Sequence, residues 1–71
     1  MPMLSARNQL NATVKSIASD KIMAEVVVTL DGGQEVVSVI TASSVERLGL
    51  KVGQQVTVVI KSTEVMLAVG E

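Results

Sequence analysis

The sequence predicts an all-β domain. Apolar and polar residues alternate along most of its 71 residues, and a period of two is typical of strands. Turn-forming residues interrupt this alternation repeatedly, and only one short stretch has a helical pattern. We therefore expect residues 1–71 to form a single small domain.

The first half of the chain predicts three strands. Residues 10–17 form the first, and residues 22–30 form the second after a polar break. Residues 31–34 (Asp-Gly-Gly-Gln) predict a hairpin because glycine takes positive φ without strain. A third strand follows over residues 35–41. In the first strand, strict alternation puts these residues on one face: Leu10, Ala12, Val14 and Ser16.

One short helix is predicted over residues 43–50. Ser43 and Glu46 fit a capping box at its start, and Gly49 can end it in the left-handed conformation. A fourth strand then covers residues 56–61. Ser62 and Thr63 break the apolar run, and the alternating residues 65–69 predict a fifth strand.

Three strands, a helix and two further strands match a five-stranded OB-like barrel, in which a helix lies between strands three and four. Several strands are apolar on both faces, for example at residues 26–28 and 58–60. The hydrophobic fraction is 48% and the mean hydropathy is +0.50. Because no segment is long enough to span a membrane and no leader pattern opens the chain, we expect subunit contacts to cover this surface. We predict a cytoplasmic oligomer without a membrane partner.

Composition excludes several classes of function. The chain has no Cys and no His, so it lacks thiolate and imidazole metal ligands and the usual general base at neutral pH. It also has no aromatic residue and a net charge of −1, so bases or pterins have no stacking surface and polyphosphates have no basic face. We expect no enzyme, no metal bound by side chains and no nucleic-acid partner.

Three polar segments remain as candidates for a small anion site. Residues 5–7 and 61–63 each place one cation beside hydroxyl groups, and residues 41–44 bring hydroxyls to the helix start. Each has an ordinary structural explanation: a solvated strand-end cation or a helix cap. None of the three contains a carboxylate, which favours a deprotonated oxyanion such as molybdate, tungstate or sulfate over phosphate.

Two of these segments also resemble a family signature. Ser5-Ala6-Arg7-Asn8-Gln9-Leu10 and Lys61-Ser62-Thr63-Glu64-Val65-Met66 resemble the signature of the molbindins, small molybdate-binding proteins of the Mop family with a single Mop (TOBE-like) domain. The resemblance implies an OB-like homohexamer, a trimer of dimers, that stores molybdate, and also tungstate, at subunit interfaces. The site residues it implies are Ser5, Ala6, Arg7, Thr41, Ser44, Lys61 and Ser62.

The chain also departs from that family. Asn11-Ala12 stands where many members have Lys-Gly, and Asp20 lies in a loop where an inward carboxylate would repel an anion. These departures leave open an alternative function: a structural oligomerisation module of the same fold with weak or lost oxyanion binding.

Overall fold

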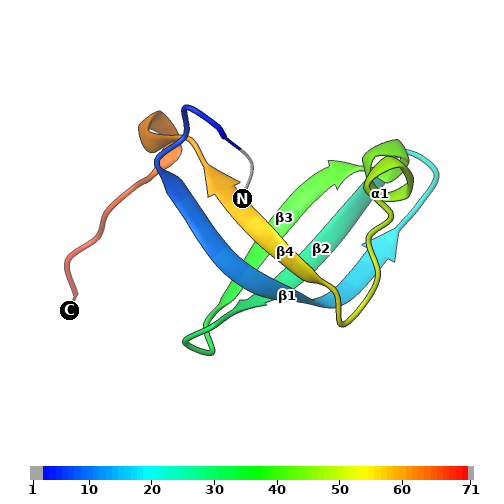
Figure 1. Cartoon of the computed structure of the whole chain (residues 1–71), viewed down its shortest axis with the longest axis horizontal. Helices are drawn as coiled ribbons and strands as arrows, with labels where there is room; N and C mark the ends of the chain where they lie inside the picture. The colour runs from blue at the N-terminus through cyan, green and yellow to red at the C-terminus, as the bar shows by residue number, and fades with distance from the viewer. Residues whose placement is uncertain (1–2, 71) are drawn as a thin grey trace.

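The structure, a computed structural model, describes residues 3–70. Four antiparallel strands form one sheet in the order β3-β2-β1-β4, and this sheet is strongly curled (Figure 1). The strands are β1 (Asn8–Ser19), β2 (Met23–Leu30), β3 (Glu35–Thr41) and β4 (Gln55–Ile60). Helix α1 (Ala42–Leu48) joins β3 to β4, and a 3₁₀ helix, η1 (Ser62–Glu64), follows β4.

The all-β prediction and the helix between strands three and four are confirmed. The predicted bounds of β3 agree with the structure, and the hairpin before it closes through Gly33, whose φ is 96°. The predicted fifth strand is wrong for this chain by itself. Residues 65–70 have no regular structure, because the described chain offers them no adjacent strand as a hydrogen-bonding partner.

The core is small and lies on the concave face of β1 and β2. Its fully buried members are Ala12, Val14, Ala24, Val26 and Val28. Inward residues of β3, β4 and α1 pack around four of these but stay partly exposed. One chain therefore forms a half-barrel whose apolar interior is only partly covered.

A β-bulge interrupts the alternation of β1. Val14 pairs with Val28, but the next pair is Ser16 with Val27, so Lys15 is the extra residue. A bulge reverses the faces of the residues that follow it. The prediction that Ser16 shares the face of Val14 is therefore wrong, and Ile17 packs against the core instead.

Helix α1 begins and ends with hydrogen-bonded caps. Its N-cap is Thr41, not the predicted Ser43, because the Thr41 hydroxyl accepts from the Ser44 amide at 3.1 Å. At the other end Gly49 adopts φ 65°, as predicted. The Leu50 amide then donates to the Val45 carbonyl at 3.1 Å, which is the Schellman pattern. The helix thus occupies residues 42–48 rather than 43–50, and it fixes three hydroxyls at its start.

Candidate functional site

Two predicted cations lie at the same end of the sheet. Asn8 begins β1 directly opposite Ile60, the last residue of β4, so Arg7 and Lys61 leave the ladder side by side. Both side chains are exposed, and within residues 3–70 neither makes a hydrogen bond or an ion pair. Strand pairing therefore brings together two segments that are far apart in sequence, residues 5–7 and 61–63.

The backbone around these cations supplies further donors. Lys61 is the N-cap of η1, and its carbonyl accepts from the Glu64 amide at 2.9 Å. The first amides of such a turn, those of Ser62 and Thr63, have no acceptor within the turn. On the β1 side, Gln9 donates to the Ala6 carbonyl at 2.8 Å and holds the chain just before Arg7. This end can therefore offer two cations, hydroxyls and amides to an anion.

The predicted hydroxyl cluster forms around the start of α1. Thr41 Oγ1 lies 2.7 Å from Ser44 Oγ and 3.2 Å from Ser43 Oγ, in hydrogen-bonding contact with both. Arg47 donates to Ser44 Oγ at 3.2 Å. The cluster is exposed apart from the half-buried Ser44, and it presents hydroxyls and one guanidinium on the same surface.

Arg47 is a further site candidate, although from sequence alone a solvated charge on the helix is the favoured interpretation of this residue. It lies three residues after Ser44 on α1, and residues at that spacing are neighbours on a helix surface. That spacing is a signal readable from the sequence once the helix is recognised.

The cation pair and the hydroxyl cluster lie at opposite ends of the same chain. Asn8 opens β1, whereas Thr41 pairs with Met23 beyond the far end of β1. Eleven residue steps separate Asn8 from Ser19, or roughly 36 Å along the strand at about 3.3 Å per residue. Figure 1 shows η1 and the residues just before β1 on one side of the molecule and α1 on the other. One chain places Arg7 and Lys61 at the same end of the ladder, with Ser5, Ala6 and Ser62 close to them in sequence, and it places Thr41 and Ser44 at the other end.

Asp20 lies near the hydroxyl end but is held in a local turn. Its carboxylate accepts from the Ile22 amide at 2.8 Å and from the Met23 amide at 2.9 Å. These bonds lower the pKa of Asp20 below its ordinary value of 3.8, and the bond from Met23 has the largest effect. The carboxylate therefore has a structural role in the turn between β1 and β2.

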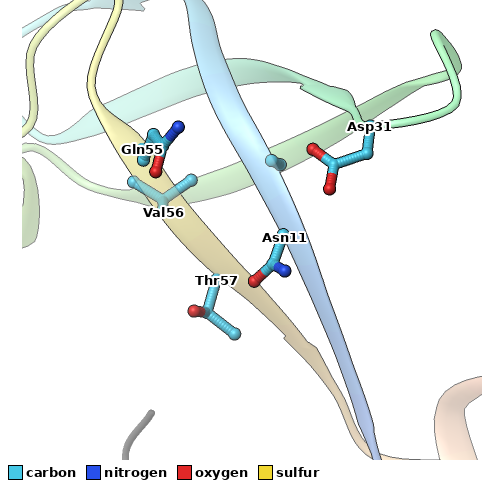
Figure 2. A pocket seen from close by; sticks show the side chains of 6 residues that line it. Asn11, Asp31, Gln55, Val56 and Thr57 are labelled. Carbon is cyan, nitrogen blue, oxygen red and sulfur yellow. The ribbon is translucent and has the colours of Figure 1, made fainter.

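A shallow polar hollow lies elsewhere, on the convex face of β1 and β4 next to the β2–β3 hairpin. Figure 2 shows Asn11, Gln55 and Thr57 around it, with the Asp31 carboxylate at its rim. Its volume is about 380 Å³, and no cation and no predicted site residue lines it. A hollow with one carboxylate and no positive charge does not suit an oxyanion.

Metal-ligating groups do not cluster in the part of the chain that the structure describes. Across residues 3–70 no group of three Asp or Glu side chains is close enough to hold a metal ion. Neither helix there has the length and hydropathy needed to cross a membrane. The fold and the cation pair thus define a class: a small OB-like domain with donor-rich strand ends.

The sequence matches the TOBE domain family over residues 4–67. Molybdenum-pterin-binding protein 1 of Clostridium pasteurianum is 48% identical over 64 residues, which cover 90% of this chain and 94% of that protein. A probable molybdenum-pterin-binding protein of Haemophilus influenzae is 38% identical over 66 residues, which cover 93% of this chain and 96% of that protein. The chain therefore belongs to the TOBE domain family, and the resemblance to the molbindins is confirmed.

Solved structures agree with this assignment. MopII from Clostridium pasteurianum, in an apo form, gives a TM-score of 0.89 at 43% identity and covers 94% of this chain and 100% of its own. A molybdate-binding protein from Sporomusa ovata gives a TM-score of 0.89 at 40% identity and covers 94% of this chain and 98% of its own. ModG, a cytoplasmic molybdate-binding protein solved with molybdate bound, gives a TM-score of 0.81 at 46% identity. The match covers 86% of this chain and 43% of ModG. These relatives are named for binding a ligand rather than for catalysis.

Proposed function

We propose that this protein binds molybdate as the intact oxyanion and stores or buffers molybdenum in the cytoplasm. Its relatives include proteins described as molybdate-binding, one of them cytoplasmic and solved with molybdate bound. Molybdate is a dianion that only accepts hydrogen bonds at neutral pH, so its site needs donors and positive charge. Tungstate has nearly the same size and charge, and we propose that it binds in the same way.

The observation that carries this proposal is the pairing of Asn8 with Ile60. It sets Arg7 and Lys61 side by side, and no carboxylate in residues 3–70 forms an ion pair with either. A dianion bound between these two exposed cations gains a charge-assisted contact from each of them. Ser5, Ala6 and Ser62 supply hydroxyl and amide donors beside the cations.

We further propose that each complete site lies between two copies of the chain. Thr41 and Ser44 are too far from Arg7 within one chain to share a ligand with it, but a neighbouring copy can present its own pair. Exposed apolar residues on both faces of the half-barrel support a larger assembly, for which we propose the homohexamer, a trimer of dimers. In this arrangement the ligand also joins the subunits.

Titration calorimetry tests the function directly. Metal-free protein, sized by light scattering, is titrated with molybdate, tungstate, sulfate and phosphate at fixed pH and salt. We expect saturable binding of molybdate and tungstate that is at least about tenfold tighter than that of phosphate, or about 1.4 kcal/mol. Equal, unsaturable heats for all four anions would overturn the proposal and favour a purely structural oligomerisation module.

A further inference from the structure

The start of β2, together with the turn before it, is bonded to the start of α1. The Ile22 carbonyl accepts a hydrogen bond from the Ala42 amide at 2.8 Å, and Met23 pairs with Thr41 in the β2–β3 ladder. Figure 1 shows the β1–β2 turn beside α1. Ala42 is the first residue of α1 and Thr41 is its N-cap. Ile22 and Met23 thus hold the backbone that carries the hydroxyl cluster.

This attachment matters because α1 has little else to hold it in place. The helix has seven residues, and none of them is buried, although Val45 packs partly against the core. A helix this short is marginal without contacts from outside it. The position of the hydroxyl cluster therefore depends strongly on the backbone bonds between α1 and the start of β2.

Asp20 is the side chain that fixes this part of β2. Its Oδ1 atom accepts from the Ile22 amide at 2.8 Å and from the Met23 amide at 2.9 Å. The Asp20 amide also donates to the Met23 carbonyl at 3.0 Å. Asp20 is therefore bonded to the same two residues that hold the start of α1.

We propose that Asp20 is a positioning residue for the oxyanion site. It fixes Ile22 and Met23, and these fix the hydroxyls of Thr41 and Ser44, while Asp20 itself makes no contact with the ligand. Donors that are ordered before binding lose less entropy when the ligand arrives, so a fixed cluster binds more tightly than a mobile one. The inference rests on the proposed function, because it concerns one half of that site.

The charge of Asp20 and its role as an acceptor have opposite effects on a bound anion. A carboxylate near the site repels the ligand, whereas its two hydrogen bonds hold the groups that donate to the ligand. D20N removes the charge and keeps an oxygen acceptor, and D20A removes both. Repulsion alone predicts that D20A and D20N bind alike, and both more tightly than wild type. Positioning predicts that D20A binds more weakly than D20N.

Titration calorimetry with molybdate on the assembled protein measures these affinities. We expect D20N to bind within about threefold of wild type, and D20A to bind about tenfold more weakly than D20N. Equal affinities for D20A and D20N would overturn the proposal.

G33A is the matched control for a general loss of stability. Gly33 has φ 96°, so Ala there strains the β2–β3 hairpin. The hairpin lies at the other end of the β2–β3 ladder from Thr41, and we expect G33A to bind molybdate like wild type. A loss of affinity in G33A as large as that in D20A would overturn the positioning role, because stability alone would then explain both.

Amide hydrogen exchange tests the positioning without any ligand. The Ala42 amide reports on the start of α1, and the Leu30 amide, which donates across the hairpin at 2.7 Å, reports on the other end of the ladder. In NMR measurements on ligand-free protein we expect D20A to speed exchange at Ala42 about tenfold relative to D20N, with little change at Leu30. G33A should have the reverse effect. Exchange at Ala42 that is equal in D20A and D20N would overturn the proposal.

The titration also keeps this inference distinct from the proposed function. If wild type bound no molybdate, the proposed function would fail, and Asp20 could not position donors for that ligand. If wild type bound molybdate and D20A bound it as tightly as D20N, the positioning role alone would fail.

Discussion

Asn8 lies opposite Ile60 at the end of the β1–β4 ladder, and its side-chain amide also donates to the Ile60 carbonyl at 3.3 Å. This double attachment joins the start of β1 to the end of β4. It therefore fixes the positions from which Arg7 and Lys61 project, although 54 positions separate the two residues in sequence. The cation pair is a property of the strand register, and any change that shifts the register disperses it.

Removing either cation should weaken oxyanion binding without unfolding the protein. R7A and K61A each delete one charge-assisted contact, which is worth about 1.5–3 kcal/mol and predicts an affinity for molybdate that is weaker by roughly 10- to 150-fold. K51A is the matched control, because Lys51 is an exposed cation in the connection between α1 and β4, away from this end. Titration calorimetry measures all three. Unchanged binding in both R7A and K61A would remove these residues from the site.

Thr41 should contribute to stability as well as to the hydroxyl cluster. T41A removes the oxygen that accepts from the Ser44 amide, so we expect the free energy of unfolding to fall by about 1 kcal/mol. T41S keeps that oxygen and should lose much less. Urea unfolding of ligand-free protein at one fixed concentration gives the comparison. If T41A and T41S were equally stable, the N-cap would lie elsewhere.

Asp20 should make stability depend on pH in acid. Its pKa is lowered in the folded protein because the Met23 and Ile22 amides donate to the ionised carboxylate. A lowered folded pKa gives stability that is present above the ordinary value of 3.8 and lost as pH falls through the folded value. D20N keeps an oxygen acceptor but does not titrate. The stability of wild type relative to D20N should therefore decline as the pH falls from about 5 to about 2. A stability difference that stayed constant over this range would contradict the role of the ionised Asp20 carboxylate in the turn.

Val14 should be the most sensitive position of the core. It is 1% exposed, and it packs with Ala12, Val26 and Val28 where the sheet curls. V14A deletes two buried methyl groups and should cost about 2 kcal/mol of unfolding free energy. V52A makes the same change at an exposed loop position, 66% accessible, and should cost less than about 0.5 kcal/mol. Thermal or urea unfolding distinguishes the two.

Local signals in the sequence predicted most of the secondary structure. The glycines that follow Leu30 predicted the hairpin, and Gly49 predicted the end of the helix. Gly33 and Gly49 both adopt the positive φ that these local structures require. The β1 bulge was missed, since the extra residue at Lys15 arises from pairing with β2, which alternation within one strand does not specify. The fifth strand was predicted from alternation, but a strand also needs a neighbour, and one chain provides none for residues 65–70 in the described structure.

The candidate site, like the fold, could be predicted from the sequence only in part. Its residue types could be chosen from sequence, because hydroxyls and cations without carboxylates form a recognisable set. Their arrangement in space could not be predicted, because it depends on strand pairing. The β1–β4 register places Arg7 beside Lys61, and the β2–β3 register places Thr41 at the opposite end of the sheet. The residues predicted to form one oxyanion site between subunits therefore lie on two separate surfaces of each chain.

The most direct test of a site shared between copies is a mixing experiment with R7A and T41A. An assembly of R7A alone lacks Arg7 at every site, and an assembly of T41A alone lacks Thr41 at every site. If Arg7 and Thr41 reach a ligand from different chains, random co-assembly restores about a quarter of the sites with both residues intact. We predict that calorimetry on the co-refolded mixture recovers this fraction of tight molybdate binding. A mixture that binds no better than the average of the two variants would contradict the shared site.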